Sequence, residues 1–386
     1  MEYDPGSYEV QADPFPVYAW MRDEAPLYRN ERLDFWALSR FDDVHAALAD
    51  PATYSSAHGV QLEQSAETLG LQAEMILNMD PPRHSELRQL VSRAFTSRRI
   101  AELEDAVRTE CRALLDDLAE AGGGDLVDDY AAIVPAAVIA ALVGLDPAER
   151  VPLRELTDRV NHREPGSIQP PDDAGVAGIA MYKLFAGLVE RRKGSPADDL
   201  ASALIATGLG DVEMIMFDLL LAVAGYETAS KLIANLGVAL ARDREQRSLV
   251  LADPSLAAAA VEESLRHDGS SHYVGRVTTT EVTWHGATVP AGGRVLLVIG
   301  AANRDDREFA DPDRFDLERS AKRHLAFGHG IHFCLGAALA RLEGRVALQE
   351  LLARFPHYDV DLDALGRKFS TNFRGYSSVP VAVTPA

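Results

Sequence analysis

The sequence predicts a mainly helical α+β fold with small β-sheets at the edge of the molecule. Long stretches carry apolar residues at helical spacing, whereas the alternation typical of strands is confined to a few short segments. Hydrophobic residues make up 47% of the chain and are spread along it, so a large core can form. The 386 residues would allow two or three average domains, but we see no repeat and no linker that would divide them.

The first half of the chain contains one expected strand and several helices. Residues 35–38 have strand character, and residues 101–121 form an amphipathic helix with leucine and valine at helical spacing. Three glycines at 122–124 predict a loop after that helix. A polar, proline-containing stretch at 165–171 predicts a second break between helical patterns.

The second half begins with a long helical pattern over residues 211–241. Asp253 and Pro254 predict the start of another helix, which ends at Gly269. Strand signals follow at 274–283 and 295–299, separated by a turn that contains two glycines, and again at the C-terminal end.

Charge and cysteine content exclude several classes of protein. The 38 basic and 59 acidic residues give 38 − 59 = −21, which argues against a nucleic-acid binder. Two cysteines, Cys111 and Cys334, are too few for a disulfide scaffold, so we expect a cytoplasmic protein and a structural role for Cys111. We expect no signal peptide and no membrane anchor, because the richest apolar run, residues 214–221, is short and contains Asp218.

Residues 327–336 (FGHGIHFCLG) carry the most chemical information. Cys334 ends a glycine-rich loop, and an alanine- and leucine-rich helix follows at once over 336–352. A thiol at a helix N-terminus is favoured as the thiolate, which is both the nucleophilic and the metal-binding form. Glycines at 328, 330 and 336 remove side chains where something large and flat must approach the backbone.

Three other interpretations of this segment stay open on the residues alone. Cys334 could be a plain buried cysteine, or a nucleophile paired with a histidine. It could bind zinc with His324, His329 and His332, although the paired short spacings of structural zinc sites are missing. Each of these interpretations leaves Phe327 and the three glycines unexplained.

The segment resembles the haem-binding signature of the cytochrome P450 family. Every fixed position of that signature is present, at Phe327, Gly328, Gly330, His332, Cys334 and Gly336. The resemblance implies that Cys334 is the axial thiolate ligand of the iron in haem b (iron protoporphyrin IX). A thiolate ligand pushes electron density onto the iron and favours O–O cleavage. Phe327 would pack against the haem beside the sulfur.

Further segments resemble the family in the family order. Glu263 and Arg266 lie on one helix face, where a solvated surface pair would be the ordinary interpretation. They match the family's Glu-x-x-Arg, with Arg314 as the expected third member of a network that holds the cysteine loop.

The long helix contains the sequence AGYET at 224–228, which could be a helix with a tolerated glycine. It resembles the family's distal pattern. There, Ala224 and Gly225 would make room for dioxygen over the haem, and Glu227 and Thr228 would organise protons and water as the catalytic pair.

The two haem propionates need cationic or donor partners. By resemblance these are His84, Arg88, Arg276 and His332; His84 and Arg88 lie four apart on one expected helix face. A histidine and an arginine at this spacing would otherwise be an ordinary surface feature.

The resemblance extends over nearly the whole chain and implies a single P450 domain over residues 1–386. It would be triangular and mostly helical, with haem between the long distal helix and the helix after the cysteine loop, as in soluble bacterial members. The implied activity is monooxygenation: one oxygen atom from O2 enters a C–H bond or an alkene of a medium-to-large apolar substrate. Fatty acids, terpenoids, steroids and polyketides all fit.

No Gly-x-Gly-x-x-Gly follows a strand, so electrons would come from a separate ferredoxin or flavodoxin with an NAD(P)H-dependent reductase. An acidic ferredoxin would need a basic patch, for which Arg98, Arg99, Arg341 and Arg345 are the candidates, or these are ordinary surface arginines. Two alternatives remain, a peroxide-driven peroxygenase and a non-enzymatic haem-based ligand binder. The Glu227–Thr228 pair disfavours both.

By alignment to the family, the substrate pocket would be built from residues 55–76, Leu220, Ala224, 270–274 and 372–376. Residues from His162 to Pro171 would lie in a mobile lid. His272 could contact a ligand or merely cap a turn, and we expect the turn.

Overall fold

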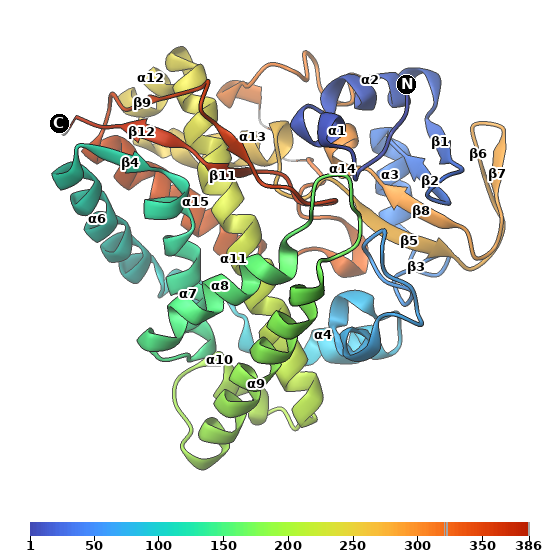
Figure 1. Cartoon of the computed structure of the whole chain (residues 1–386), viewed down its shortest axis with the longest axis horizontal. Helices are drawn as coiled ribbons and strands as arrows, with labels where there is room; N and C mark the ends of the chain where they lie inside the picture. Colours follow the sequence, from blue (N-terminus) through green and yellow to red (C-terminus); the bar gives the residue numbers. More distant parts are fainter. Residues whose placement is uncertain (320, 322, 385–386) are drawn as a thin grey trace.

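The computed structural model describes residues 1–319, 321 and 323–384, apart from the side chains of Arg93, Ala94 and Ser97. It confirms the predicted mainly helical fold with small sheets, and its outline in Figure 1 narrows from the top toward α9 and α10.

The helices have the following bounds: α1 Tyr8–Ala12, α2 Phe15–Glu24, α3 Phe41–Ala49, α4 Arg83–Ala94, α5 Ser97–Ala101, α6 Glu104–Ala121, α7 Ile133–Val143, α8 Arg150–Asn161, α9 Asp172–Gly194, α10 Leu200–Ile205, α11 Asp211–Arg242, α12 Arg244–Ala252, α13 Ala257–His267, α14 Ile299–Ala302 and α15 Ala337–Arg354. The strands are β1 Leu27–Asn30, β2 Phe35–Leu38, β3 Tyr54–Ser55, β4 Gly123–Asp125, β5 Val274–Thr278, β6 Val282–Trp284, β7 Ala287–Val289, β8 Arg294–Leu297, β9 Asp359–Val360, β10 Gly366–Arg367, β11 Tyr376–Ser378 and β12 Pro380–Ala382.

A five-stranded sheet lies at one edge of the molecule, on the right of Figure 1, in the order β1-β2-β8-β5-β3. The β2–β8 pair is parallel and the other three pairs are antiparallel. The register places Arg276 of β5 opposite Val295 of β8. The β2–β8 and β3–β5 pairs connect the start of the chain with the region that leads into the cysteine loop.

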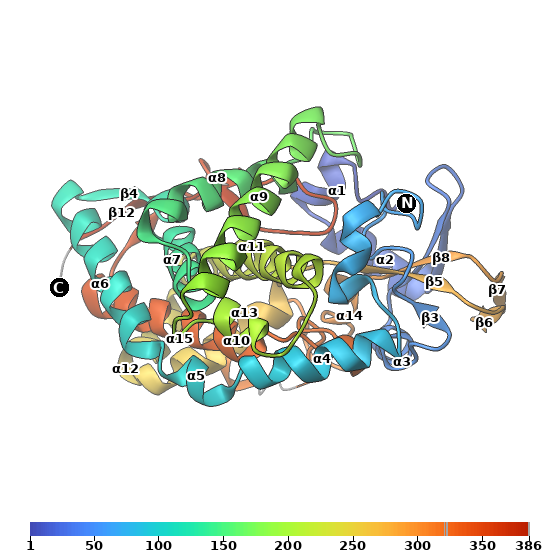
Figure 2. The same cartoon turned by 90° about the horizontal axis from the view of Figure 1, so that it is seen from below.

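Helix α11 runs through the middle of the molecule (Figure 2). Most of its 32 residues from Met214 onward are buried, because it packs against α7 and α9 and also against α13 and α15. In Figure 2, α8 and α9 lie on one side of α11, and α13 and α15 lie on the other. The helix after the cysteine loop therefore packs directly on the longest helix.

Two expected elements differ from the structure in informative ways. The helix predicted over 101–121 is α6, which begins only at Glu104, and Ala101 instead ends the short preceding helix α5. The glycines at 122–124 do more than form a loop, because Gly123–Asp125 pairs with β12 at the other end of the chain. Gly123 has a φ of 145°, and a Cβ there would collide with the Val381 carbonyl. Glycine therefore permits a close antiparallel contact that the local sequence does not reveal.

The region from 253 to 299 also divides more finely than expected. Asp253 caps a short 3₁₀ turn through its side chain, and α13 then ends at His267, two residues before the predicted stop. The strand expected over 274–283 splits into β5 and β6, and Ile299 already begins α14.

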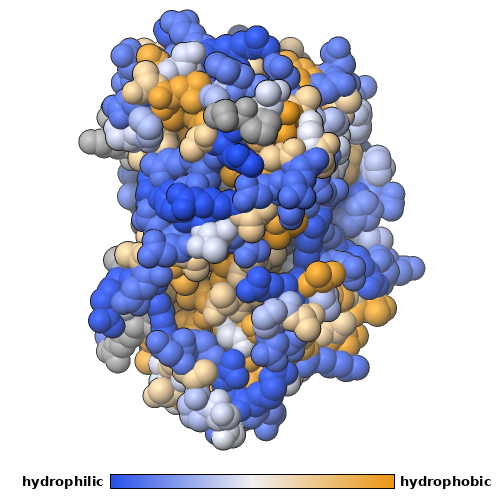
Figure 3. Space-filling view, turned by 90° about the vertical axis from the view of Figure 1, so that its left-hand side faces the viewer, coloured by the Kyte–Doolittle hydropathy of each residue, from blue (hydrophilic) through white to orange (hydrophobic). Residues whose placement is uncertain are grey.

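The face shown in Figure 3 is mostly hydrophilic, with hydrophobic patches above and below a hydrophilic band. Among the described residues, we find no helix that is both long and apolar enough to cross a membrane.

Candidate active site

A cavity of about 330 Å³ lies between α11, α15, α4 and β5. Its walls include eleven of the twelve residues that the sequence predicted for the site: His84, Arg88, Ala224, Gly225, Thr228, Arg276, Phe327, Gly328, His332, Cys334 and Gly336. Residues as far apart in the sequence as His84 and Gly336 are thus brought to one place. The twelfth residue, Glu227, is not among the described lining residues.

The cysteine loop has a backbone shape that requires glycine. Gly328 and Gly330 both have φ of 69°, in the left-handed region that L side chains rarely adopt. A Cβ on Gly330 would also lie 2.6 Å from the Leu48 carbonyl oxygen in α3. These two glycines therefore serve backbone conformation and contact with α3. The Cys334 N–H donates to the Phe327 carbonyl at 2.9 Å and closes the loop.

Cys334 lies three residues before α15, where the Gly336 amide and the charges of Arg88 and Arg341 act to lower its pKa. Burial is the larger effect and raises the pKa of the Cys334 thiol above its usual value. The helix N-terminus alone therefore does not produce the thiolate, and a bound metal ion would be the main factor that deprotonates it. Burial raises the pKa of Cys111 to about 12, which fits the structural role predicted for that residue.

The predicted propionate partners lie together on the cavity wall and form what we call the cationic cluster, in which Arg88 and Arg276 carry the positive charge and His84 and His332 are neutral rings. Neither ring nitrogen of His84 has a hydrogen-bond partner among the described residues, and its ring lies 4.3 Å from that of His332. Burial lowers the pKa of Arg276 to about 10. Burial, together with Arg276, His84 and Arg88, lowers the pKa of His332 to about 3. A buried histidine without a partner beside two arginines fits a ligand that carries carboxylates, as haem does.

Thr228 and Glu227 face different surroundings although they are adjacent in α11. The Thr228 hydroxyl lines the cavity and donates to the Ala224 carbonyl at 2.6 Å. Glu227 is 1% exposed and forms ion pairs with Lys231 and, at 3.2 Å, with Lys368. Burial raises the pKa of Glu227, but the two lysines have the larger combined effect and hold it below its usual value. The i, i+4 spacing to Lys231 was readable in the sequence, but the contact with Lys368 was not.

The Glu-x-x-Arg network is present, but the prediction of Arg314 as its third member is wrong, because Arg319 takes that place. Glu263 accepts from Arg266 at 2.7 and 2.8 Å and from Arg319 at 3.1 Å. The Arg314 side chain is exposed, and Arg314 contributes only its carbonyl, which accepts from Arg266 at 3.2 Å. The chain turns at Asp311, where φ is 49°, and runs beside α13, where the Asp316 N–H donates to Glu263 at 2.9 Å before Arg319 reaches the same carboxylate. The guanidinium that reaches Glu263 therefore belongs to Arg319 and not to the exposed Arg314.

The four arginines expected in a basic patch each lie beside a carboxylate. Arg341 pairs with Glu262, Arg345 with Glu104, Arg99 with Asp198 and Arg98 with Glu102. Their charges are therefore largely compensated within the chain.

The expected pocket segments contribute unevenly. Val60 and Ile76 line the cavity from the first segment, as do Leu220, Ala224, Ser270, Ser271, Val274 and Phe373 from the others, and Leu77 lies just beyond the predicted range. Sequence reasoning missed the apolar residues Phe95, Ile139, Phe217, Leu221 and Leu339. It also missed Glu343 of α15, a lining residue whose pKa is raised to about 8 by burial. A single glutamate within an apolar helix face was the only available signal for it.

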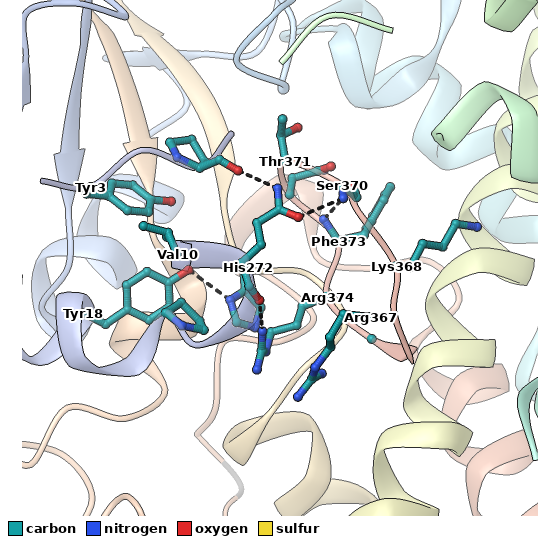
Figure 4. A pocket seen from close by; sticks show the side chains of 15 residues that line it. Tyr3, Val10, Tyr18, His272, Arg367, Lys368, Ser370, Thr371, Phe373 and Arg374 are labelled. Carbon is teal, nitrogen blue, oxygen red and sulfur yellow. Dashed lines mark hydrogen bonds between the residues drawn. The ribbon is translucent and has the colours of Figure 1, made fainter. Parts of the chain in front are cut away.

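His272 lies outside the cavity, in a polar cluster near the N-terminus (Figure 4). Its Nδ1 is 3.0 Å from the Tyr18 hydroxyl, and its backbone N–H donates to the Asn372 carbonyl at 2.8 Å. Segments 270–274 and 372–376 thus pair with each other, with one side toward the cavity and the other toward α2. The His272 side chain therefore contacts the Tyr18 hydroxyl of α2 instead of capping a turn as expected.

Comparison with known proteins agrees with this geometry. A family model described as Cytochrome P450 matches residues 215–373. The chain is 42% identical to cytochrome P450 123 of Mycobacterium tuberculosis, over 98% of this chain and 96% of that protein. It is 40% identical to the vitamin D(3) 25-hydroxylase of Pseudonocardia autotrophica, over 97% and 94%. The structure of cytochrome P450 CYP109Q5 from Chondromyces apiculatus superposes with a TM-score of 0.89 at 33% identity, covering 100% of this chain and 98% of that one. The chain therefore belongs to the cytochrome P450 family, whose members bind haem b through a cysteine thiolate and are oxygen-incorporating oxidoreductases.

Proposed function

We propose that this protein is a monooxygenase that inserts one oxygen atom from O2 into a medium-to-large apolar molecule. The observation that carries the proposal is the cavity itself. It joins Cys334 and the cationic cluster to the Gly225–Thr228 turn of α11, and the rest of its wall is mainly apolar. This arrangement supports a place for haem, for oxygen and for an apolar substrate in one continuous cavity.

Each group of residues has a distinct proposed role. Cys334 holds the iron, and the cationic cluster of His84, Arg88, Arg276 and His332 binds the propionates. Bound haem supplies the oxygen-activating chemistry. The chain then positions the reacting groups and excludes water with apolar side chains, which strengthens electrostatic interactions within the site.

Thr228 is the proposed residue that holds a proton donor beside the oxygen, since it lies in the cavity wall. Glu227 acts behind it as an ionised carboxylate that organises the protons of Lys231 and Lys368. Its carboxylate is kept in place by Lys231 and Lys368, and Lys368 also contacts Asp158 of α8 at 2.7 Å. The three charged side chains around Glu227 link α11 to α8 and to the segment between β10 and β11.

The substrate is proposed to be bulky and mainly apolar, with few polar groups. Phe217, Leu220, Leu221 and Ile139 provide apolar wall, and Ser270 and Ser271 provide a small polar region. The similarity to a vitamin D(3) 25-hydroxylase supports a steroid-like or terpenoid molecule and supports C–H hydroxylation rather than epoxidation. Fatty acids and polyketides are the competing classes.

The proposed electron donor is a ferredoxin or flavodoxin with its NAD(P)H-dependent reductase. The four candidate arginines are paired with carboxylates. We therefore expect electrostatic attraction to contribute less to docking of the electron donor than it would at a patch of unpaired arginines. The rate of reduction should therefore fall only modestly with ionic strength.

An optical titration of the ferric holoprotein with steroids, terpenoids, fatty acids and polyketides tests the proposal. A saturable shift of the Soret band identifies the class that binds beside the iron. Turnover with a surrogate ferredoxin, its reductase, NADPH and isotopically labelled O2 should then give a product with one labelled oxygen atom. Equal turnover with peroxide alone would instead make the protein a peroxygenase. Tight binding without product under either condition would make it a ligand binder.

A further inference from the structure

A fixed positive charge lies against Phe327, on the side of α15. The Cζ of Arg341 is 4.5 Å from the centroid of the Phe327 ring, a cation–π distance. The Phe327 carbonyl accepts the backbone N–H of Cys334, so the guanidinium, the ring and the cysteine form one continuous contact. Glu262 chiefly, and Cys334 to a lesser degree, raise the pKa of Arg341.

Glu262 holds this guanidinium with a two-point ion pair. The Arg341 Nε lies 2.5 Å from Oε1, and Nη2 lies 2.9 Å from Oε2. His324 contacts the same carboxylate at 3.1 Å, and its Nδ1 accepts the Ala326 N–H at 3.2 Å. Since Nδ1 accepts, the ring proton lies on Nε2 and is donated to Glu262. Glu262 is therefore oriented from both sides.

We propose that Arg341 and Glu262 form a charge pair that sets the ferric–ferrous equilibrium of the haem iron through the Cys334 thiolate. This inference rests on the proposed function, because it requires haem ligated by Cys334. Reduction adds one electron, supplied by the ferredoxin-type donor, and makes the iron–thiolate unit more negative by one charge. A nearby cation stabilises the reduced form, and a carboxylate opposes it. Arg341 and Glu262 are positioning residues here, and their opposite charges have opposite effects on the ferric–ferrous equilibrium.

Arg345, one turn further along α15, provides a matched control. Its Nη2 pairs with Glu104 at 2.7 Å, so it resembles Arg341 in chemistry, helix and ion pairing. It differs in having no described contact with Phe327. A general effect of surface charge or of partner docking should appear in both arginines, whereas an effect on the thiolate should appear only at Arg341.

Spectroelectrochemical titration of substrate-free holoprotein tests the inference. In Arg341→Gln, the equilibrium constant for reduction should fall at least threefold, about 28 mV at 59 mV per tenfold change. In Glu262→Gln it should rise by at least threefold. Arg341→Lys, which keeps the charge but loses the fork, should stay closer to the parent, and Arg345→Gln should change the constant by less than half as much as Arg341→Gln.

Two outcomes would overturn the inference: equal shifts in the Arg341 and Arg345 variants, or shifts of the same sign in the Arg341 and Glu262 variants. The ferrous–CO Soret band and circular dichroism verify that each variant retains thiolate-bound haem. If Arg341→Gln does not take up haem, the rise in Glu262→Gln decides, and its absence refutes the charge pair. The redox titration needs no substrate. If the variants shift the equilibrium constant as expected but the turnover assay gives no product, the proposed function is refuted and this inference stands.

Discussion

Replacing Arg319 by Gln tests which arginine completes the Glu263 network. The Arg319 side chain is 9% exposed, contacts Glu263 at 3.1 Å and donates to the Asp311 and Arg314 carbonyls at 2.8 and 3.1 Å. Breaking a buried ion pair by removing one partner costs about 3–5 kcal/mol when the remaining charge is left uncompensated. Glu263 keeps both bonds from Arg266, so we expect a smaller loss, about 2–3 kcal/mol.

The assay is urea unfolding of the holoprotein, followed by circular dichroism and by the Soret band. A loss of this size should lower the midpoint by about 0.5–1 M, since a long chain has a steeper urea dependence than small proteins. Arg314→Gln is the control and should change stability by less than about 0.5 kcal/mol, because that side chain is exposed. If Arg314→Gln destabilised the protein as much as Arg319→Gln, the assignment of the network would be refuted.

Three further changes have defined outcomes. Thr228→Ala should retain haem and ligand binding but lower product formation at least tenfold, with the electrons recovered as hydrogen peroxide; unchanged coupling of NADPH to product would contradict its role. Gly225→Ala should cost about 1–3 kcal/mol in urea unfolding, because the new Cβ would lie 2.8 Å from Ile139 Cγ1, and Ile139→Ala should restore part of the loss. His324 and Arg341 lower the pKa of Glu262 from 4.5 to about 2, against the effect of burial. The ion pair should therefore stabilise the protein fully above pH 4.5. Below that pH the stability difference between the parent and Glu262→Gln should shrink toward pH 2, as measured by unfolding across the range, and a difference that grew on acidification would refute the assignment.

The Glu227 environment shows how local and distant contacts divide the site. Its position beside Thr228 follows from the helical sequence, and so does Lys231 one turn away. Lys368 comes from a segment 141 residues later, and its contact depends on how the C-terminal strands fold back over α11. The sequence motif thus located the acid but could not tell that two lysines hold it away from the cavity wall.

The sequence by itself determined the elements and motifs that depend on neighbouring residues. The bounds of β2 and, to within one residue, of α11 were predictable, and the residues of the cysteine loop identified the haem site, because helical periodicity and glycine conformations act over a few residues. Only the tertiary structure decided which charges meet. Arg319 rather than Arg314 reaches Glu263, and Arg341 pairs with Glu262, which lies 79 residues earlier in the sequence. β4 pairs with the far end of the chain. Such contacts depend on the docking of whole elements, whose relative positions the spacing of residues along one segment does not specify.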